Sequence, residues 1–325
     1  MIEFKDVTKV YEDGTEAIKG INLTIPKGKL VALIGPSGCG KTTTMKMINK
    51  LISPSSGTIL INGKDTSDTD EVELRRNIGY VIQRIGLLPH MTIEENISLI
   101  PRLKGWKKEQ YEGRVDELLN LVGLDPKVYR KRYPLELSGG QQQRVGVIRA
   151  LAAEPPIILM DEPFSALDPI SREQLQDELK SIQNTIHKTI VFVTHDIDEA
   201  LKIADEIAVM RDGKIEQIAT PAELIKDPAN EFVRAFIGED RLNVQQHQKC
   251  VFDIMDENTT YLLLEESEYS SIPYDASIQE AARILLKSEK HYLMVTKDGR
   301  NVGSVTANGI LRAVASEGKK EERSV

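Results

Sequence analysis

Strand-like and helix-like patterns of hydrophobicity alternate along most of the chain. Residues 1–11 and 18–25 alternate apolar and polar side chains, which is typical of strands that bury one face. Runs that are apolar throughout predict strands buried on both faces of a sheet, and they lie at 30–34, 157–160 and 190–193. Because helical spacing separates these runs, we expect an α/β fold with a mainly parallel sheet flanked by helices.

Between residues 92 and 153 the pattern is helical. One expected helix carries the apolar positions of 115–122, and a second runs over 138–153 and ends before Pro155. We therefore expect a helical subdomain of about residues 85–155, inserted between strands of the sheet, and an antiparallel β subdomain near the N-terminus. Further strands are expected at 58–61 and 78–82, and a further helix at 172–182.

A second unit follows a helical stretch at 231–237. We expect a first domain over 1–240, a polar, glutamine-rich linker over 241–250, and a small α/β domain over 251–316. That domain is expected to open with short strands and to continue with a helix at 277–288, strands at 292–295 and 302–306, and a final helix. The charged end, 317–325, is expected to be disordered.

Composition narrows the class of protein. The 325 residues carry a net charge of −8, with basic and acidic residues interspersed, which argues against bulk nucleic-acid binding. The apolar runs are far shorter than the ~20 residues that cross a bilayer, and no secretory signal opens the chain. The two cysteines, Cys39 and Cys250, fit a reducing compartment without a disulfide framework.

A glycine-rich loop follows the apolar run 30–34. Residues 35–42 match the phosphate-binding pattern G-x-x-x-x-G-K-[ST], in the strand-to-helix context that the pattern requires. Its glycines let backbone amides turn toward phosphate oxygens, Lys41 bridges β- and γ-phosphates, and Thr42 offers its hydroxyl to Mg²⁺. The residues expected to bind the nucleotide here are Gly35, Pro36, Ser37, Gly38, Cys39, Gly40, Lys41, Thr42 and Thr43.

Two carboxylates, Asp161 and Glu162, follow the apolar run 157–160. The carboxyl ends of parallel strands share one edge of a sheet, so both are expected beside the phosphate-binding loop. Asp161 would hold Mg²⁺, directly or through water, and Glu162 would orient or deprotonate an attacking water. Such a pair without the loop would be read as a solvated strand end or a helix cap.

The sequence Leu-Ser-Gly-Gly-Gln at 137–141 opens the helix expected over 138–153. Ser138 is a favourable N-cap, and the amides that follow it are free to bind an anion. From residue chemistry alone, a well-capped helix and an anion site fit equally well.

Together these motifs, with Gln83, Ser-Ala-Leu-Asp at 165–168 and His195, resemble the nucleotide-binding subunit of an ATP-binding-cassette (ABC) transporter, with its P-loop NTPase core. The resemblance spans residues 1 to about 240. It implies that ATP and Mg²⁺ are bound, that His195 contacts the γ-phosphate, and that Gln83 contacts Mg²⁺ or the lytic water. Tyr11 would stack on adenine, although a half-buried strand tyrosine is the alternative.

The resemblance also implies partners. Ser138, Gly139 and Gly140 of one copy would cap the γ-phosphate held by Lys41 of another, so the active unit is a head-to-tail homodimer. Gln141 would also belong to the nucleotide-binding residues, and Asp168 would cross between the two copies. Closure and reopening would drive membrane-spanning permease subunits, and through them a solute-binding protein, at the cytoplasmic face of the bacterial membrane. In this scheme the catalytic residues are Glu162, His195, Gln83 and Lys41, and the metal ligands are Thr42, Gln83 and Asp161.

Three longer stretches, 80–96, 194–205 and 227–238, resemble ATPase subunits that import glycine betaine, carnitine or choline. Residues 272–315 resemble a cystathionine-β-synthase (CBS) motif, with Gly309 where that family usually has a ribose-binding aspartate. The tail is therefore either a docking or dimerisation unit or a sensor of ionic strength or nucleotide.

Other functions stay open. They are an ABC ATPase for another solute, an exporter ATPase, a soluble ABC ATPase of DNA repair or the ribosome, and a nucleotide-dependent regulator. The repair type needs a long coiled coil, and no sustained heptads occur here. The ribosomal type usually fuses two cassettes, whereas this chain has one.

Overall fold

The computed structural model describes residues 1–82, 86–165, 167–246, 250–256, 270–287, 292–297 and 300–312. The chain divides into two compact units, Met1–Gly238 and Glu239–Val325. Within the described residues no helix is both long enough and apolar enough to span a bilayer. Gln83 and the expected disordered end, 317–325, lie outside the described residues.

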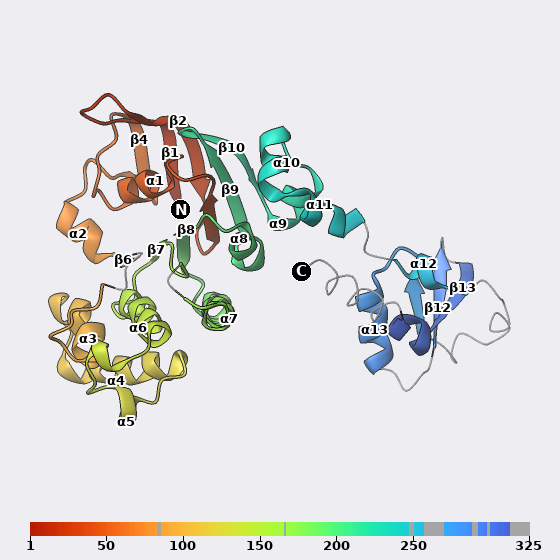
Figure 1. Cartoon of the computed structure of the whole chain (residues 1–325). Coiled ribbons are helices and arrows are strands. Elements are labelled where there is room, and N and C mark those ends of the chain that lie inside the picture. Colours follow the sequence, from red (N-terminus) through yellow and green to blue (C-terminus); the bar gives the residue numbers. More distant parts are fainter. Residues whose placement is uncertain are drawn as a thin grey trace. The chain divides into compact units, whose positions relative to one another are not determined.

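The first unit is built on a central sheet with the strand order β10-β9-β3-β8-β7-β6 (Figure 1). All neighbouring pairs are parallel except the edge hairpin β9–β10. The strands are β3 (Leu30–Ile34), β6 (Ile78–Val81), β7 (Ile157–Asp161), β8 (Thr189–Val193), β9 (Glu206–Arg211) and β10 (Lys214–Ala219). The sequence predicted β3, β6, β7 and β8, and it missed the hairpin, which turns at Asp212 and Gly213 with positive φ at both residues.

An antiparallel sheet with the order β2-β1-β4-β5 forms the second layer. Its strands are β1 (Ile2–Val10), β2 (Glu16–Ile25), β4 (Ser56–Ile61) and β5 (Lys64–Asp65). One hydrophobic core joins this sheet, helix α1 (Lys41–Ile48) and one face of the central sheet. The core therefore fixes the start of α1, where the phosphate-binding loop ends.

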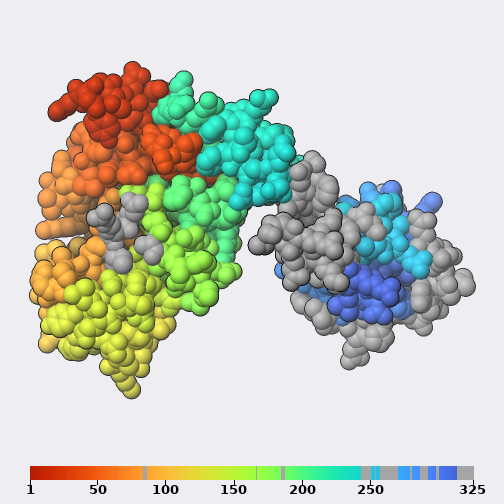
Figure 2. Space-filling model, in the orientation of Figure 1, coloured from red at the N-terminus to blue at the C-terminus, as the bar shows by residue number. Residues whose placement is uncertain are grey.

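Helices α3 to α6 form a separate lobe at one end of this unit, coloured orange to yellow-green in Figures 1 and 2. They are α3 (Ile93–Leu103), α4 (Lys108–Leu121), α5 (Pro126–Tyr129) and α6 (Gly139–Leu151), with a 3₁₀ turn over Pro134–Glu136. Thr92 and Glu95 form a capping box at the start of α3, as Ser138 and Gln141 do for α6. Both helix starts are thus set by local sequence.

The remaining helices of the first unit each follow a strand of one of the two sheets, except α10, which follows α9. They are α2 (Glu71–Arg76), α7 (Pro169–Ile186), α8 (Ile197–Ile203), α9 (Pro221–Lys226) and α10 (Glu231–Ile237). Asp168 caps α7 and Asp196 caps α8. These caps place two segments of expected function, 162–168 and 194–196, directly before helix N-termini.

The second unit contains a sheet with the order β11-β12-β13, in which β11 pairs parallel with β12 and β13 antiparallel. Its elements are α11 (Glu239–Gln246), α12 (Val251–Ile254), β11 (Ser270–Pro273), α13 (Ile278–Lys287), β12 (Tyr292–Lys297), β13 (Arg300–Thr306) and helical residues 307–312. Two expectations were wrong here. Most of the expected linker is the helix α11, and residues 251–254 are helical instead of extended.

Candidate nucleotide-binding site

Three strands place the residues of expected function at one edge of the central sheet. β3, β7 and β8 are parallel neighbours, and Val193 pairs with both Leu33 and Asp161. The phosphate-binding loop after β3, the carboxylates at the end of β7 and His195 after β8 therefore lie at the same level. Ligands bind at this edge of open parallel sheets.

The phosphate-binding loop needs glycine for reasons of geometry. Gly35 and Gly40 have φ of 147° and 108°, a range that side chains rarely adopt. A Cβ at Gly35 would lie 2.1 Å from the carbonyl oxygen of Met210, and one at Gly40 would lie 2.6 Å from Cδ1 of Ile18. The neighbouring β9 and β2 strands thus press against the loop and fix its course.

Lys41 begins α1 and is only 6% exposed. Its ammonium donates hydrogen bonds to the carbonyl oxygens of Gly35 (2.7 Å) and Pro36 (2.8 Å). The loop therefore holds the cation against its own backbone, close to the amides that the motif offers to phosphate.

Thr42 and Asp161 meet across the site, because the Thr42 hydroxyl donates to Oδ1 of Asp161 at 3.0 Å. Burial raises the pKa of Asp161, while the Thr42 hydrogen bond and the charge of Lys46 oppose that change. A hydroxyl and a carboxylate at this distance are oxygen donors of the kind that Mg²⁺ prefers. A cation bound there would favour the ionised carboxylate, so these two residues fit the metal.

Glu162 and His195 form the second pair of the site, with Oε1 of Glu162 3.3 Å from Nδ1 of His195. The Glu162 backbone is left-handed, at φ 46°. Its N–H donates to the Val193 carbonyl at 2.9 Å, and its carbonyl accepts from the amide and hydroxyl of Ser165. Those bonds hold an unfavourable backbone conformation in place, which is common where a side chain must be aimed at a reaction centre.

Tyr11 lies at the rim of the site. Its hydroxyl is 3.1 Å from that of Thr43, and the Lys9 ammonium lies 5.4 Å from the ring centre. The residue is 38% exposed, so an open part of its surface is available for stacking.

The segment 137–141 lies in the helical lobe. Ser138 caps α6 and Gln141 completes the capping box, while the Gln141 amide group donates to the Tyr129 hydroxyl at 3.0 Å. These contacts stay within the lobe, whereas Lys41 begins α1 and Glu162 follows β7, at the edge of the central sheet. Asp168 accepts from the amide of Ser171 at 3.0 Å, and hydrogen bonding by the side chain and the amide of Ser171 lowers the pKa of its carboxyl group.

The structure therefore brings together Tyr11, residues 35–43, Asp161, Glu162 and His195, and it places Ser138–Gln141 on another lobe. Gln83 lies outside the described residues, so its expected role stays a prediction.

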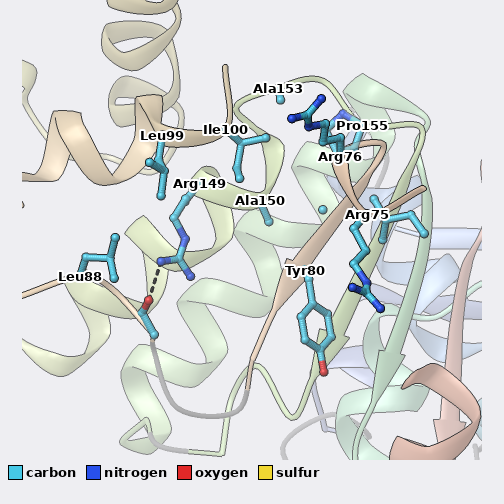
Figure 3. Close-up of a pocket in the computed structure, with 13 residues that line it drawn as sticks. Arg75, Arg76, Tyr80, Leu88, Leu99, Ile100, Arg149, Ala150, Ala153 and Pro155 are labelled. Atoms are coloured by element: carbon cyan, nitrogen blue, oxygen red, sulfur yellow. Dashed lines mark hydrogen bonds between the residues drawn. The ribbon is translucent and has the colours of Figure 1, made fainter. Parts of the chain in front are cut away.

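A pocket of about 290 Å³ lies between β6 and the helical lobe, near the site but separate from it (Figure 3). Arg149 extends from α6 into it and donates to the carbonyl of Gly86 at 2.6 Å. Burial lowers the pKa of this guanidinium, and no carboxylate of the described residues forms an ion pair with it. Sequence reasoning missed Arg149, because α6 also carries Arg144 and nothing in the sequence separates the arginine that is largely buried from the other.

Both units of the chain resemble known proteins. Residues 18–165 match the family model "ABC transporter", and residues 251–316 match "CBS domain". The chain is 52% identical to the choline transport ATP-binding protein of Bacillus subtilis, over 92% of this chain and 76% of that one. It is 61% identical to the glycine betaine/carnitine/choline transport ATP-binding protein of the same organism, over 74% and 63%. Among solved structures, a dimeric bacterial ABC transporter cassette matches with 39% identity and a TM-score of 0.62, over 68% of this chain and 99% of that one.

Proposed function

Because the chain belongs to the family of ABC transporter ATP-binding subunits, we propose that it hydrolyses ATP to drive import of a quaternary-amine solute across the bacterial cytoplasmic membrane. The observation that carries the ATPase part is the convergence of Lys41, the Thr42–Asp161 pair and the Glu162–His195 pair at one sheet edge. The solute class rests on relatives named for choline, carnitine and glycine betaine.

The residues divide the chemical work. Loop amides and Lys41 would bind the phosphates, and Tyr11 would stack on the base. Thr42 and Asp161 would hold Mg²⁺, with Gln83 as a further ligand, and the ion supplies charge neutralisation along the phosphates. Glu162 would accept a proton from the attacking water, and His195, beside it, would donate a hydrogen bond to the γ-phosphate.

Two copies would form each complete site. Within one chain, Lys41 begins α1, whereas Ser138–Gln141 lie in the helical lobe. A capping box formed by Ser138 and Gln141 fixes the backbone amides at the start of α6. A second copy, placed head to tail, would bring its Ser138, Gly139 and Gly140 to the γ-phosphate. Its Asp168 would lie at the interface between the two copies. The similarity to a dimeric cassette supports this arrangement.

The membrane-spanning partner would dock at the pocket around Arg149. Tyr80 and Gly86 both line the pocket, and in the sequence they lie on either side of Gln83. A partly buried guanidinium without an acidic partner in the described residues favours a docking segment that carries a carboxylate. Arg149→Met is expected to weaken co-purification with the membrane subunits, whereas Arg234→Met, on α10, leaves it unchanged.

The direct test is uptake by membrane vesicles that contain this subunit and its membrane partners. ATP-dependent accumulation of radiolabelled choline, carnitine or glycine betaine is the expected result, with the Glu162→Gln protein as the inactive control. ATP hydrolysis without uptake of any of the three would contradict the solute class and leave the ATPase assignment standing.

A further inference from the structure

Arg172 contacts both segments that flank the Glu162–His195 pair. It lies in the first turn of α7, and its Nη2 donates to the carbonyl oxygen of Leu167 at 3.2 Å. The same guanidinium lies 3.8 Å from Oδ2 of Asp196 and 3.8 Å from Oε1 of Glu199. One cation thus spans from the loop before α7 to the turn that carries His195.

That turn is itself held by Thr194. The Thr194 hydroxyl donates to Oε2 of Glu199 at 2.5 Å and accepts from the amide of Asp196 at 3.0 Å. His195 lies between these hydrogen-bonded neighbours, so its backbone is fixed on both sides. A shift of the Glu199 carboxylate would move the Thr194 hydroxyl and, with it, the position of His195.

Burial disfavours the charged form of the Glu199 carboxyl group. The residue is 5% exposed, and burial raises the pKa of the carboxyl group, while Thr194 and Arg172 oppose that change. A buried carboxylate is retained at low cost only where hydrogen bonds and a cation accompany it. Arg172 is a cation that accompanies this carboxylate, with its Nε 3.8 Å from Oε1 of Glu199.

The contact between Arg172 and Glu199 is an ion pair without a hydrogen bond. Nε of Arg172 is buried and has no hydrogen-bond partner, and Oε1 of Glu199 lies too far away to accept from it. A small movement of the start of α7, together with the loop before it, toward α8 would convert this ion pair into a hydrogen bond. A shift of that loop would therefore change the contact of Arg172 with Glu199 and, through Thr194, the position of His195.

We propose that Arg172 is a positioning residue: it keeps the loop that carries Asp168 in register with the turn that carries His195. It acts through Glu199 and Asp196 and contacts no reacting atom. The inference rests on the proposed ATPase function, because it assigns Arg172 an effect on the hydrolytic step through His195.

The test compares Arg172→Gln, Arg172→Lys and Lys202→Gln in the complex with the membrane subunits. Lys202 is the matched control, because it pairs with Asp177 at 2.8 Å and so joins the same two helices, α7 and α8, away from the site. Arg172→Gln is expected to lower kcat about tenfold and to leave KM for ATP within about twofold, since misplacement of a catalytic group affects turnover more than binding. Arg172→Lys should recover part of kcat, because it keeps the charge without the fork of donors.

A spectroscopic readout tests the same inference without turnover. The imidazole ¹³C–¹H resonance of His195, assigned by substitution in the isolated full chain, should move in Arg172→Gln and stay in place in Lys202→Gln. An unmoved resonance, or a kcat loss equal in the two glutamine variants, would overturn the proposal. A wild-type complex without ATP hydrolysis would count against the proposed function instead, and the resonance would still decide the role of Arg172.

Discussion

Oε1 of Glu162 lies 3.3 Å from Nδ1 of His195, although the two residues follow different strands of the central sheet. The left-handed backbone at Glu162 aims its carboxylate at this neighbour, and the hydrogen bond from its amide to Val193 ties it to the strand that precedes His195. A carboxylate and an imidazole are thereby held side by side at the edge where Lys41 and Thr42 would hold phosphates.

Glu162→Gln should abolish turnover and spare ATP binding. The amide keeps the size of the side chain but cannot accept a proton, and loss of a general base costs about 10²–10⁴-fold in rate. Phosphate release should fall by at least about a hundredfold, while size-exclusion chromatography with ATP shows accumulated dimers. Glu173→Gln, at an exposed site of α7, is the control that keeps its activity. Near-normal hydrolysis by Glu162→Gln would reject Glu162 as the base.

Lys41→Ala should remove ATP binding from the whole chain. Lys41 is the cation held inside the phosphate-binding loop. In the CBS domain, Gly309 stands where that family usually has a ribose-binding aspartate, so the domain has no carboxylate there. Equilibrium dialysis of the full chain should give one ATP per chain for wild type and for Lys64→Ala, and none for Lys41→Ala. Saturable ATP binding that survives in Lys41→Ala would locate a second site, in the CBS domain.

Gly40→Ala should destabilise the fold as well as block the loop. The new methyl group would combine a φ of 108° with approaches of 2.6 Å to Cδ1 of Ile18 and 2.8 Å to the carbonyl oxygen of Ala17. Gly63→Ala has a similar backbone penalty, at φ 80°, but meets nothing within 4 Å. We expect about 1 kcal/mol of destabilisation for Gly63→Ala and clearly more for Gly40→Ala in urea unfolding. Equal losses would mean that the contacts with β2 relax at no cost.

The site could be predicted from sequence where its geometry is local. The loop 35–42 and the carboxylates after the run 157–160 are each defined by a strand and the residues that follow it, and parallel strands end at a common edge. The left-handed conformation of Glu162 could not be predicted in this way, because it depends on hydrogen bonds to Val193 and Ser165.

The misses have physical causes. The sequence analysis predicts no strands on either side of Asp212-Gly213, although this dipeptide is a strong signal for a hairpin such as β9–β10. Helix α11 has almost no apolar periodicity, so its sequence reads as a linker. The contact of Arg172 with Glu199 depends on how α7 packs against α8, which no local pattern encodes.

Asp161→Asn should make the protein more stable and inactive. Burial raises the pKa of Asp161, so the folded state binds this proton more tightly than the unfolded chain does. Stability from this group is therefore present below the unfolded pKa and is lost as the pH rises through the raised folded pKa. At neutral pH the wild type consequently carries a carboxylate that the fold disfavours. An asparagine still accepts the Thr42 hydrogen bond without that charge.

The melting temperature of metal-free Asp161→Asn at pH 7 should exceed that of wild type by a few degrees, and the difference should shrink as the pH is lowered toward 4. Asp68→Asn, at an exposed site, serves as the control with no such change. ATP hydrolysis should be lost in Asp161→Asn, because its neutral amide oxygen is a weaker ligand for Mg²⁺ than a carboxylate. A destabilised variant, or one whose stability gain does not depend on pH, would show that the Asp161 charge is already compensated within the fold.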